Sequence, residues 1–228
     1  MLDDDDVFGD GLDGFGAEGS IVADNTAVIA PQLVPEIKLH LADADLPLYR
    51  AGEDELAALG IGTPYWAFAW AGGQALARYL LDNPSSVAGR KVLDFGAGSG
   101  IVAIAAVMAG AFDVTAADID PVAAEAMALN RTVNDVWFEI ETDDVVGTSG
   151  DWEVLLVGDV FYDREMADRQ LPWLRDQLAL GRRVLVGDPG RLQVRTLGLE
   201  PLAEYHAPTT GIMEDSDLRN ARVWRFTG

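Results

Sequence analysis

One loop constrains this chain more than any other feature. Residues 94–100 read Asp-Phe-Gly-Ala-Gly-Ser-Gly, between a short apolar run at 91–95 and an apolar stretch that begins at Ile101. Glycine lets the backbone turn sharply and approach a ligand closely, and the first turn of a helix offers free N–H donors. A strand, glycine loop and helix in this order predict a ligand crevice at the carboxyl end of a parallel strand.

The chain that follows the loop alternates between strand and helix patterns, which predicts an α/β fold. We expect a doubly wound parallel sheet with helices on both faces. The last two predicted strands would form an antiparallel edge. The expected strands are 91–95, 113–117, 136–141, 152–157, 183–187, 198–206 and 221–226, and the expected helices are 101–109, 121–134 and 164–180.

The sequence before the first strand divides into two parts. Residues 1–20 are rich in aspartate and glycine and carry no basic residue, so we expect a flexible acidic tail. Residues 21–84 are interpreted as an N-terminal helical segment, with an amphipathic pattern from Pro31 to Gly62. Thr63 and Pro64 would begin a further helix that runs to residue 81. We expect residues 85–228 to form the main domain.

The charge balance excludes several classes of partner. The chain has 16 Lys and Arg against 38 Asp and Glu, a net charge of −22. Nucleic acids and anionic membranes attract clustered basic residues, so neither is an expected partner. Without cysteine, and with 2 histidines, the chain has no evident metal site. The acidic N-terminus is no signal peptide and no apolar run could span a bilayer, so we expect a cytoplasmic protein.

The residues around the loop favour a nucleoside ligand with an ammonium group. The spacing Gly96-x-Gly98-x-x-Ile101 departs from the dinucleotide fingerprint. Asp94 would repel a pyrophosphate but would attract an ammonium group. Asp118, at the end of the second strand, can accept hydrogen bonds from both ribose hydroxyls, a feature that enzymes using NAD share.

Two further positions could contact the base. Ile119 would pack on an adenine ring, and Asp143 and Asp144, after the third strand, could receive its amino group. A solvated turn is the alternative interpretation of the two aspartates, and a bare tight turn is the alternative for the glycine loop, including Gly100.

The pattern Asp94-x-Gly96-x-Gly98-x-Gly100 resembles motif I of class I S-adenosylmethionine methyltransferases. The resemblance implies S-adenosylmethionine as cofactor, S-adenosylhomocysteine as product, and a seven-strand Rossmann-like sheet within residues 85–228. It also implies that the end of the fourth strand faces the transferred methyl group.

The fourth predicted strand ends in Gly-Asp159-Val-Phe161-Tyr162-Asp. A carboxylate with two aromatic rings suits a cationic amine, through charge attraction and cation–π contact. Packing of both rings under the following helix is the alternative. The spacing Asp159-x-x-Tyr162 resembles the Asp/Glu-x-x-Tyr/Phe motif of the seven-strand protein lysine methyltransferases. The closest resemblance is to the electron transfer flavoprotein β-subunit lysine methyltransferase family and its bacterial relatives.

Five stretches carry this resemblance: 33–41, 64–81, 92–100, 158–163 and 186–191. It implies methylation of the Nε atom of a lysine in a protein, and the expected substrate is the electron transfer flavoprotein β-subunit. It also implies that Asp159 and Tyr162 are catalytic residues. It also implies that Trp70 approaches the cofactor.

Three residues are expected on the substrate side: Phe161, Trp66 and Arg191. Core packing of Trp66 and Trp70 is the alternative, and Arg191 could instead pair with Asp188. The enzyme is expected to be a monomer. Alternative functions are methylation of another protein nitrogen or of a small amine, or a catalytically silent module that binds the cofactor.

Overall fold

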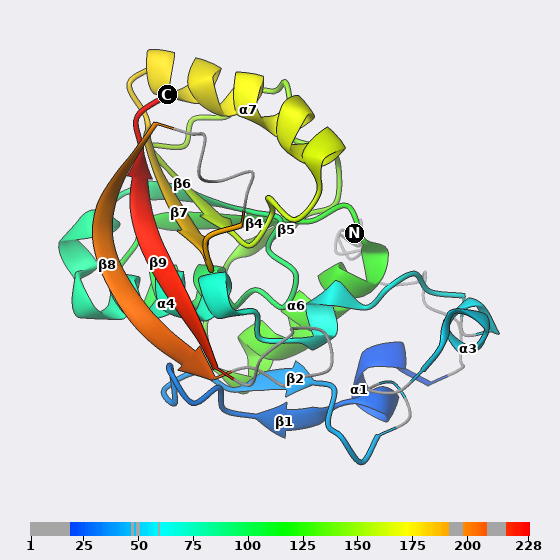
Figure 1. Ribbon diagram of the computed structural model, residues 1–228. Helices are drawn as coiled ribbons and strands as arrows, with labels where there is room; N and C mark the ends of the chain where they lie inside the picture. Colours follow the sequence, from blue (N-terminus) through cyan, green and yellow to red (C-terminus); the bar gives the residue numbers. More distant parts are fainter. Residues whose placement is uncertain (1–18, 47, 49–50, 59, 192–197, 209–217) are drawn as a thin grey trace, which may run out of the picture.

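The computed structural model describes residues 19–46, 48, 51–58, 60–191, 198–208 and 218–228 (Figure 1). Residues 1–18 of the predicted acidic tail lie outside the described residues. Ser20, which we assigned to that tail, belongs to the folded body. Its hydroxyl caps the helix α1 (Ile21–Asn25) and contacts Glu125.

The centre of the molecule is the predicted seven-stranded sheet, with strand order β5-β4-β3-β6-β7-β9-β8. The first five strands in this order are parallel, and β9 and β8 form an antiparallel edge, as the sequence predicted. The strands are β3 (Lys91–Phe95), β4 (Asp113–Ala117), β5 (Glu139–Glu141), β6 (Val154–Gly158), β7 (Arg183–Asp188), β8 (Leu199–Pro208) and β9 (Leu218–Phe226).

Helices cover both faces of the sheet (Figure 1). The helices α4 (Ala71–Asp82) and α5 (Ile101–Met108) pack on one face, and α7 (Arg164–Ala179) packs on the other. Within β6, Leu156 faces the first layer and Leu155 the second, because successive side chains of a strand point to opposite faces. Burial on both faces explains the nearly continuous apolar sequence of this strand. The helix α6 (Pro121–Val133) packs beside β5 and against the N-terminal segment.

The N-terminal segment differs from the helical prediction. Residues 31–46 contain no helix. Instead β1 (Ala27–Ile29) and β2 (Leu39–Leu41) pair as a small antiparallel ladder. Ile37, Leu39 and Leu41 are buried at every second position, which is the period of a strand rather than of a helix. Pro35 lacks the N–H that a helix interior requires. The stretch from Pro31 to Gly62, expected to be helical, does contain the short helix α3 (Glu53–Ala58).

The stretch expected to be one helix from Tyr65 to Leu81 is interrupted. A 3-10 turn, η1 (Tyr65–Ala67), ends at Phe68, and α4 begins after Trp70, which occupies its N-cap position in an extended conformation. Thr63 therefore does not cap α4. The interruption brings the side chains of this segment to the edge of the sheet where the parallel strands end.

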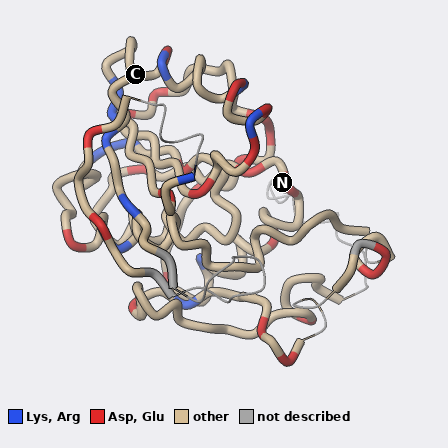
Figure 2. Tube along the Cα trace, in the orientation of Figure 1, with Lys and Arg blue, Asp and Glu red and all other residues tan. Residues whose placement is uncertain are grey.

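Acidic side chains are spread over the molecule. Figure 2 shows aspartate and glutamate on α7, along the β8–β9 edge and in the N-terminal segment. Among the described residues, no helix is both long and apolar enough to cross a membrane.

Candidate active site

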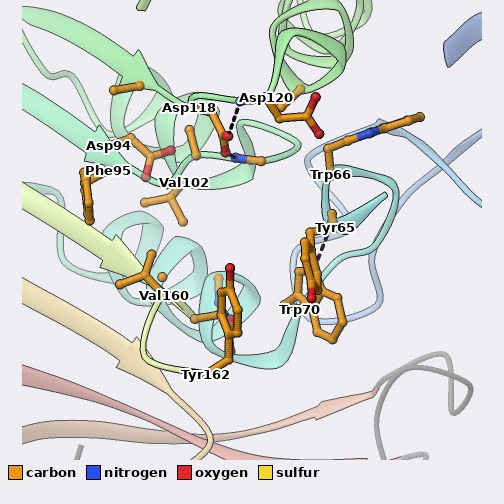
Figure 3. Close-up of a pocket in the computed structure, with 18 of the residues that line it drawn as sticks. Tyr65, Trp66, Trp70, Asp94, Phe95, Val102, Asp118, Asp120, Val160 and Tyr162 are labelled. Atoms are coloured by element: carbon orange, nitrogen blue, oxygen red, sulfur yellow. Dashed lines mark hydrogen bonds between the residues drawn. The ribbon is translucent and has the colours of Figure 1, made fainter. Parts of the chain in front are cut away.

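A cavity of about 800 Å³ opens at the carboxyl ends of the parallel strands (Figure 3). In the sheet, β4 lies next to β3 on one side, and β6, which comes later in the chain, lies next to β3 on the other side. Such a reversal leaves a crevice between the loops that follow these strands, which is where ligands bind in open α/β sheets. The cavity is lined by the loops after β3, β4, β5, β6 and β7, by η1 and by parts of α4 and α7.

The glycine loop lies against this cavity in a conformation that favours glycine. Gly96, Gly98 and Gly100 have φ angles of 67°, 52° and 77°. A Cβ atom on Gly96 would lie 2.6 Å from Cγ1 of Val160, so a larger residue there would push the end of β6 away. The loop thus turns tightly, and Gly96 and Gly98 line the cavity. Gly100, which we also expected at the cofactor, is buried at the start of α5 and does not line the cavity.

Two carboxylates flank the loop, and burial changes both. The side chain of Asp94 points to the start of α5, where its Oδ2 accepts a hydrogen bond from Ala103 N at 2.8 Å. Burial raises the pKa of Asp94 to about 7. Asp118 Oδ2 accepts a hydrogen bond from Gly98 N at 2.8 Å, and burial raises its pKa as well. Neither carboxylate has a basic partner in the described part of the chain. A ligand ammonium would relieve this burial of charge.

The part of the cavity that contains Asp94 and Asp118 also has apolar and hydrogen-bonding groups that suit a planar base. Ile119 is 65% exposed although it is apolar, and it lines the cavity. Asp144 lies at the rim and pairs with Arg169 of α7, which holds the pKa of Asp144 below its usual range. Gln170 is buried in the cavity wall, and its Oε1 has no hydrogen-bond partner in the described structure. A buried acceptor of this kind fits a ligand amino group.

The other half of the cavity is aromatic. The ring centroids of Tyr162 and Tyr65 lie 5.3 Å apart, and those of Tyr65 and Trp70 lie 6.0 Å apart. Trp70 Nε1 donates a hydrogen bond to the carbonyl oxygen of Tyr65 at 2.8 Å, which fixes the two relative to one another. In Figure 3 these rings gather on one side of the cavity and Asp94 and Asp118 on the other. Tyr65 was not predicted, although it begins the aromatic block that contains Trp66 and Trp70.

Two expected substrate contacts are corrected by the structure. Phe161 is 1% exposed, does not line the cavity, and packs in the core between the sheet and α7. Trp66 is equally buried and packs with Ala123 and Ala126 of α6. Its backbone contributes to the cavity wall, but its ring extends away from the centre of the cavity (Figure 3). Both rings therefore stabilise the walls of the site instead of facing a substrate.

Asp159 reaches the site in an unusual backbone conformation, with a φ angle of 59°. Its Oδ2 accepts a hydrogen bond from Gly73 N at 2.6 Å, and its Oδ1 lies 2.7 Å from Nη1 of Arg191. Burial raises the pKa of Asp159 to about 6, and the adjacent guanidinium opposes that rise. Arg191 also pairs with Asp188, at 2.8 Å, which was one of its two expected roles.

Comparison with known proteins identifies the family. Residues 75–155 match the family model of the ribosomal protein L11 methyltransferase (PrmA). Over 91% of its length the chain is 42% identical to the electron transfer flavoprotein beta subunit lysine methyltransferase of Xenopus laevis, of which it covers 86%. It is 39% identical to the Homo sapiens protein of the same name, over 91% of this chain and 81% of that protein. The chain belongs to the electron transfer flavoprotein β-subunit lysine methyltransferase family.

The solved structures agree on the fold of this family member. The N-methyltransferase NodS of Bradyrhizobium japonicum superposes with a TM-score of 0.50 at 17% identity, over 68% of this chain and 94% of NodS. At this identity the likeness shows the fold alone. The L11 methyltransferase model spans α4 to β6, the part that carries the glycine loop and Asp118.

Proposed function

We propose that this protein transfers a methyl group from S-adenosylmethionine to the Nε atom of a lysine in the electron transfer flavoprotein β-subunit. The similarity to family members along about nine-tenths of the chain carries this proposal. The cavity supports it, because a polar half suited to a nucleoside adjoins an aromatic half suited to an amine.

The polar half would hold the cofactor. Asp94 would bind the ammonium group and Asp118 the ribose hydroxyls, while the exposed backbone of the glycine loop lies between them. Ile119 would pack on the adenine, with Asp144 and Gln170 as acceptors for its amino group. When bound, S-adenosylmethionine supplies a methyl group on a sulfonium centre, which is open to in-line attack.

The aromatic half would prepare the lysine. A lysine ammonium, with an ordinary pKa of about 10.4, must lose a proton before its nitrogen can attack. Contact with Tyr65 and Tyr162 removes water and so favours the neutral amine. Trp70, which we expected beside the cofactor, packs next to Tyr65 and completes this aromatic wall. Asp159 would orient the amine, and the proton would leave to solvent. Alignment of the two reactants would supply most of the rate, since it contributes about 7–11 kcal/mol in favourable cases.

Labelling tests this function directly. The purified enzyme is incubated with methyl-labelled S-adenosylmethionine and electron transfer flavoprotein from the same source, and mass spectrometry locates the label. We expect methyl groups on lysine of the β-subunit, and loss of the label when that lysine is changed to arginine. Ribosomal protein L11 and a small-amine mixture serve as parallel acceptors. Label in either of these, with none in the β-subunit, would contradict the proposal.

A further inference from the structure

The residue at the end of β6 is less available to a substrate than its motif predicts. Both oxygens of Asp159 already accept a hydrogen bond within the protein, and its side chain is 8% exposed. A lysine ammonium would have to share an oxygen with Gly73 N or with Arg191. The contacts of Arg191 explain why the carboxylate is placed in this way.

Arg191 bridges two carboxylates through a single nitrogen. Its Nη1 lies 2.7 Å from Asp159 Oδ1 and 2.8 Å from Asp188 Oδ2. Asp188 is fully buried, and its Oδ1 also accepts hydrogen bonds from the backbone of Gly190 and Arg191, at 2.6 and 2.7 Å. Asp188 therefore fixes the loop after β7, and that loop holds the guanidinium against Asp159.

Asp159 in turn joins three parts of the cavity wall. Through Gly73 N it contacts the first turn of α4. A Cβ atom on Gly72 would lie 2.7 Å from Asp159 Oδ2, so the carboxylate fills the space beside that helix. The next residue, Val160, packs against Gly96 of the cofactor loop, and Tyr162 stacks on Tyr65. A shift of Asp159 would move both halves of the cavity.

The left-handed backbone of Asp159 also indicates that its contacts hold this residue in place. Residues other than glycine rarely adopt such a conformation, and they keep it only where the surroundings hold them. Here the surrounding contacts are the Arg191 ion pair, the Gly73 hydrogen bond, and a hydrogen bond from Asp159 N to the Gly187 carbonyl at 2.9 Å.

We infer that Arg191 is a positioning residue of this active site, which acts through Asp159 and does not itself recognise the protein substrate. This inference rests on the proposed function for the reaction that is measured, whereas the contacts among Arg191, Asp159 and Asp188 do not depend on that function. Without the guanidinium, Asp159 and Asp188 would be two buried like charges with no cation between them. Removing one member of such a group is strongly destabilising, because it leaves buried charge uncompensated. Asp159 would then take up a proton at a higher pH than it does beside the guanidinium.

A double-mutant cycle tests this inference. Arg191→Met, Asp159→Asn and the double variant are compared for methyl transfer, with Arg175→Met on the exposed face of α7 as the matched control. Asparagine tolerates the left-handed backbone, so Asp159→Asn removes charge with little strain. We expect each single variant to lose on the order of 10²-fold in kcat, as for a misplaced reacting group. The double variant should be no more than about threefold worse than Asp159→Asn. Losses that multiply in the double variant would overturn the inference.

Two further readouts separate positioning from substrate contact. Because one nitrogen makes both ion pairs, a lysine ammonium with its three donors can replace it, so Arg191→Lys should recover most of the activity that Arg191→Met loses. KM for the protein substrate should change less than about threefold in both variants. A raised KM with an unchanged kcat is the sign of a lost contact with the substrate itself, and Arg191 makes no such contact under this inference. A raised KM with kcat intact would assign Arg191 to partner binding and overturn the inference.

A third readout needs no substrate. Carboxyl carbon NMR of the protein labelled in aspartate, with Asp159→Asn used for assignment, follows the protonation of Asp159. Its pKa should be higher in Arg191→Met than in the natural protein, because Asp188 remains nearby while the cation is gone. An unchanged pKa would overturn the inference even if the β-subunit is not the substrate. If Arg191→Met does not fold, Arg191→Gln takes its place in all three measurements.

Discussion

At the scale of single residues, burial determines the chemistry of Asp94. Its pKa is raised to about 7 in the folded protein, whereas an unfolded chain has a pKa of about 3.9 at this group. Between these pH values the folded state holds a proton that the unfolded state has lost. The free energy of unfolding of the ligand-free protein therefore decreases as pH rises from about 4 to about 7.

Asp94→Asn should change both the stability of the protein and its affinity for the cofactor product. The variant should be more stable than the natural protein, by more at pH 7.5 than at pH 5, and should bind S-adenosylhomocysteine at least about tenfold more weakly, through loss of a charged hydrogen bond. Urea unfolding at the two pH values and calorimetry with S-adenosylhomocysteine provide the measurements. An equal change in stability at both pH values would show that Asp94 is ionised in the folded state throughout.

Tyr162 allows a milder test at the same scale. Its ring centroid lies 5.3 Å from that of Tyr65 at an interplanar angle of 30°, and the residue is 44% exposed. Tyr162→Phe should keep the aromatic wall and lose less than about tenfold in kcat, the value of one ordinary hydrogen bond. Tyr162→Ala, which removes the ring, should lose clearly more. Steady-state kinetics of the two variants make the comparison, and equal losses would assign the role to the hydroxyl.

At the scale of elements, the approach of α4 to β7 depends on paired glycines. A Cβ atom on Gly72 would lie 2.4 Å from the carbonyl oxygen of Gly187. The neighbouring Gly73 has room, because the nearest atom to its Cβ would be Ile101 Cγ2 at 3.4 Å. The two positions share a helix and a sequence context, so they form a matched pair.

Alanine at each position tests this close approach. Gly72→Ala should lower the free energy of unfolding by about 1–3 kcal/mol, as overpacking does. Gly73→Ala should change it by less than about 1 kcal/mol, since alanine favours a helix and no backbone is displaced. Urea unfolding of both variants is the measurement. A neutral effect at Gly72 would mean that the helix can move away from the sheet at little cost.

At the scale of the whole molecule, the net charge of −22 acts on association with the substrate. An acidic surface speeds the approach of a lysine-bearing partner, and salt screens exposed charges beyond about 10 Å at 0.1 M ionic strength. We expect kcat/KM for the protein substrate to fall as salt rises, while kcat and the affinity for S-adenosylhomocysteine change little. Kinetics across a salt series would contradict steering if kcat/KM stayed constant.

The sequence by itself determined the sheet, its flanking helices and the place of the site. These features depend on local signals: an apolar run of strand length, a helical period, and glycines at 96, 98 and 100 that permit a left-handed turn. Because parallel strands end at one edge of a sheet, the order of elements was enough to bring Asp94, Asp118 and Asp159 to one cavity. Resemblance to a known family added the reaction and its substrate.

Only the tertiary structure decided which side chains face that cavity and which partners they have. Phe161 and Trp66 are as aromatic as Tyr162 and Tyr65, but their rings are buried in the core. The pairing of Asp159 with Arg191 joins residues 32 positions apart, on loops that meet only when β6 and β7 are aligned. The strand at 39–41 likewise depends on its partner at 27–29. Side-chain direction and ion pairing depend on packing between distant segments, and a local pattern carries no information about such contacts.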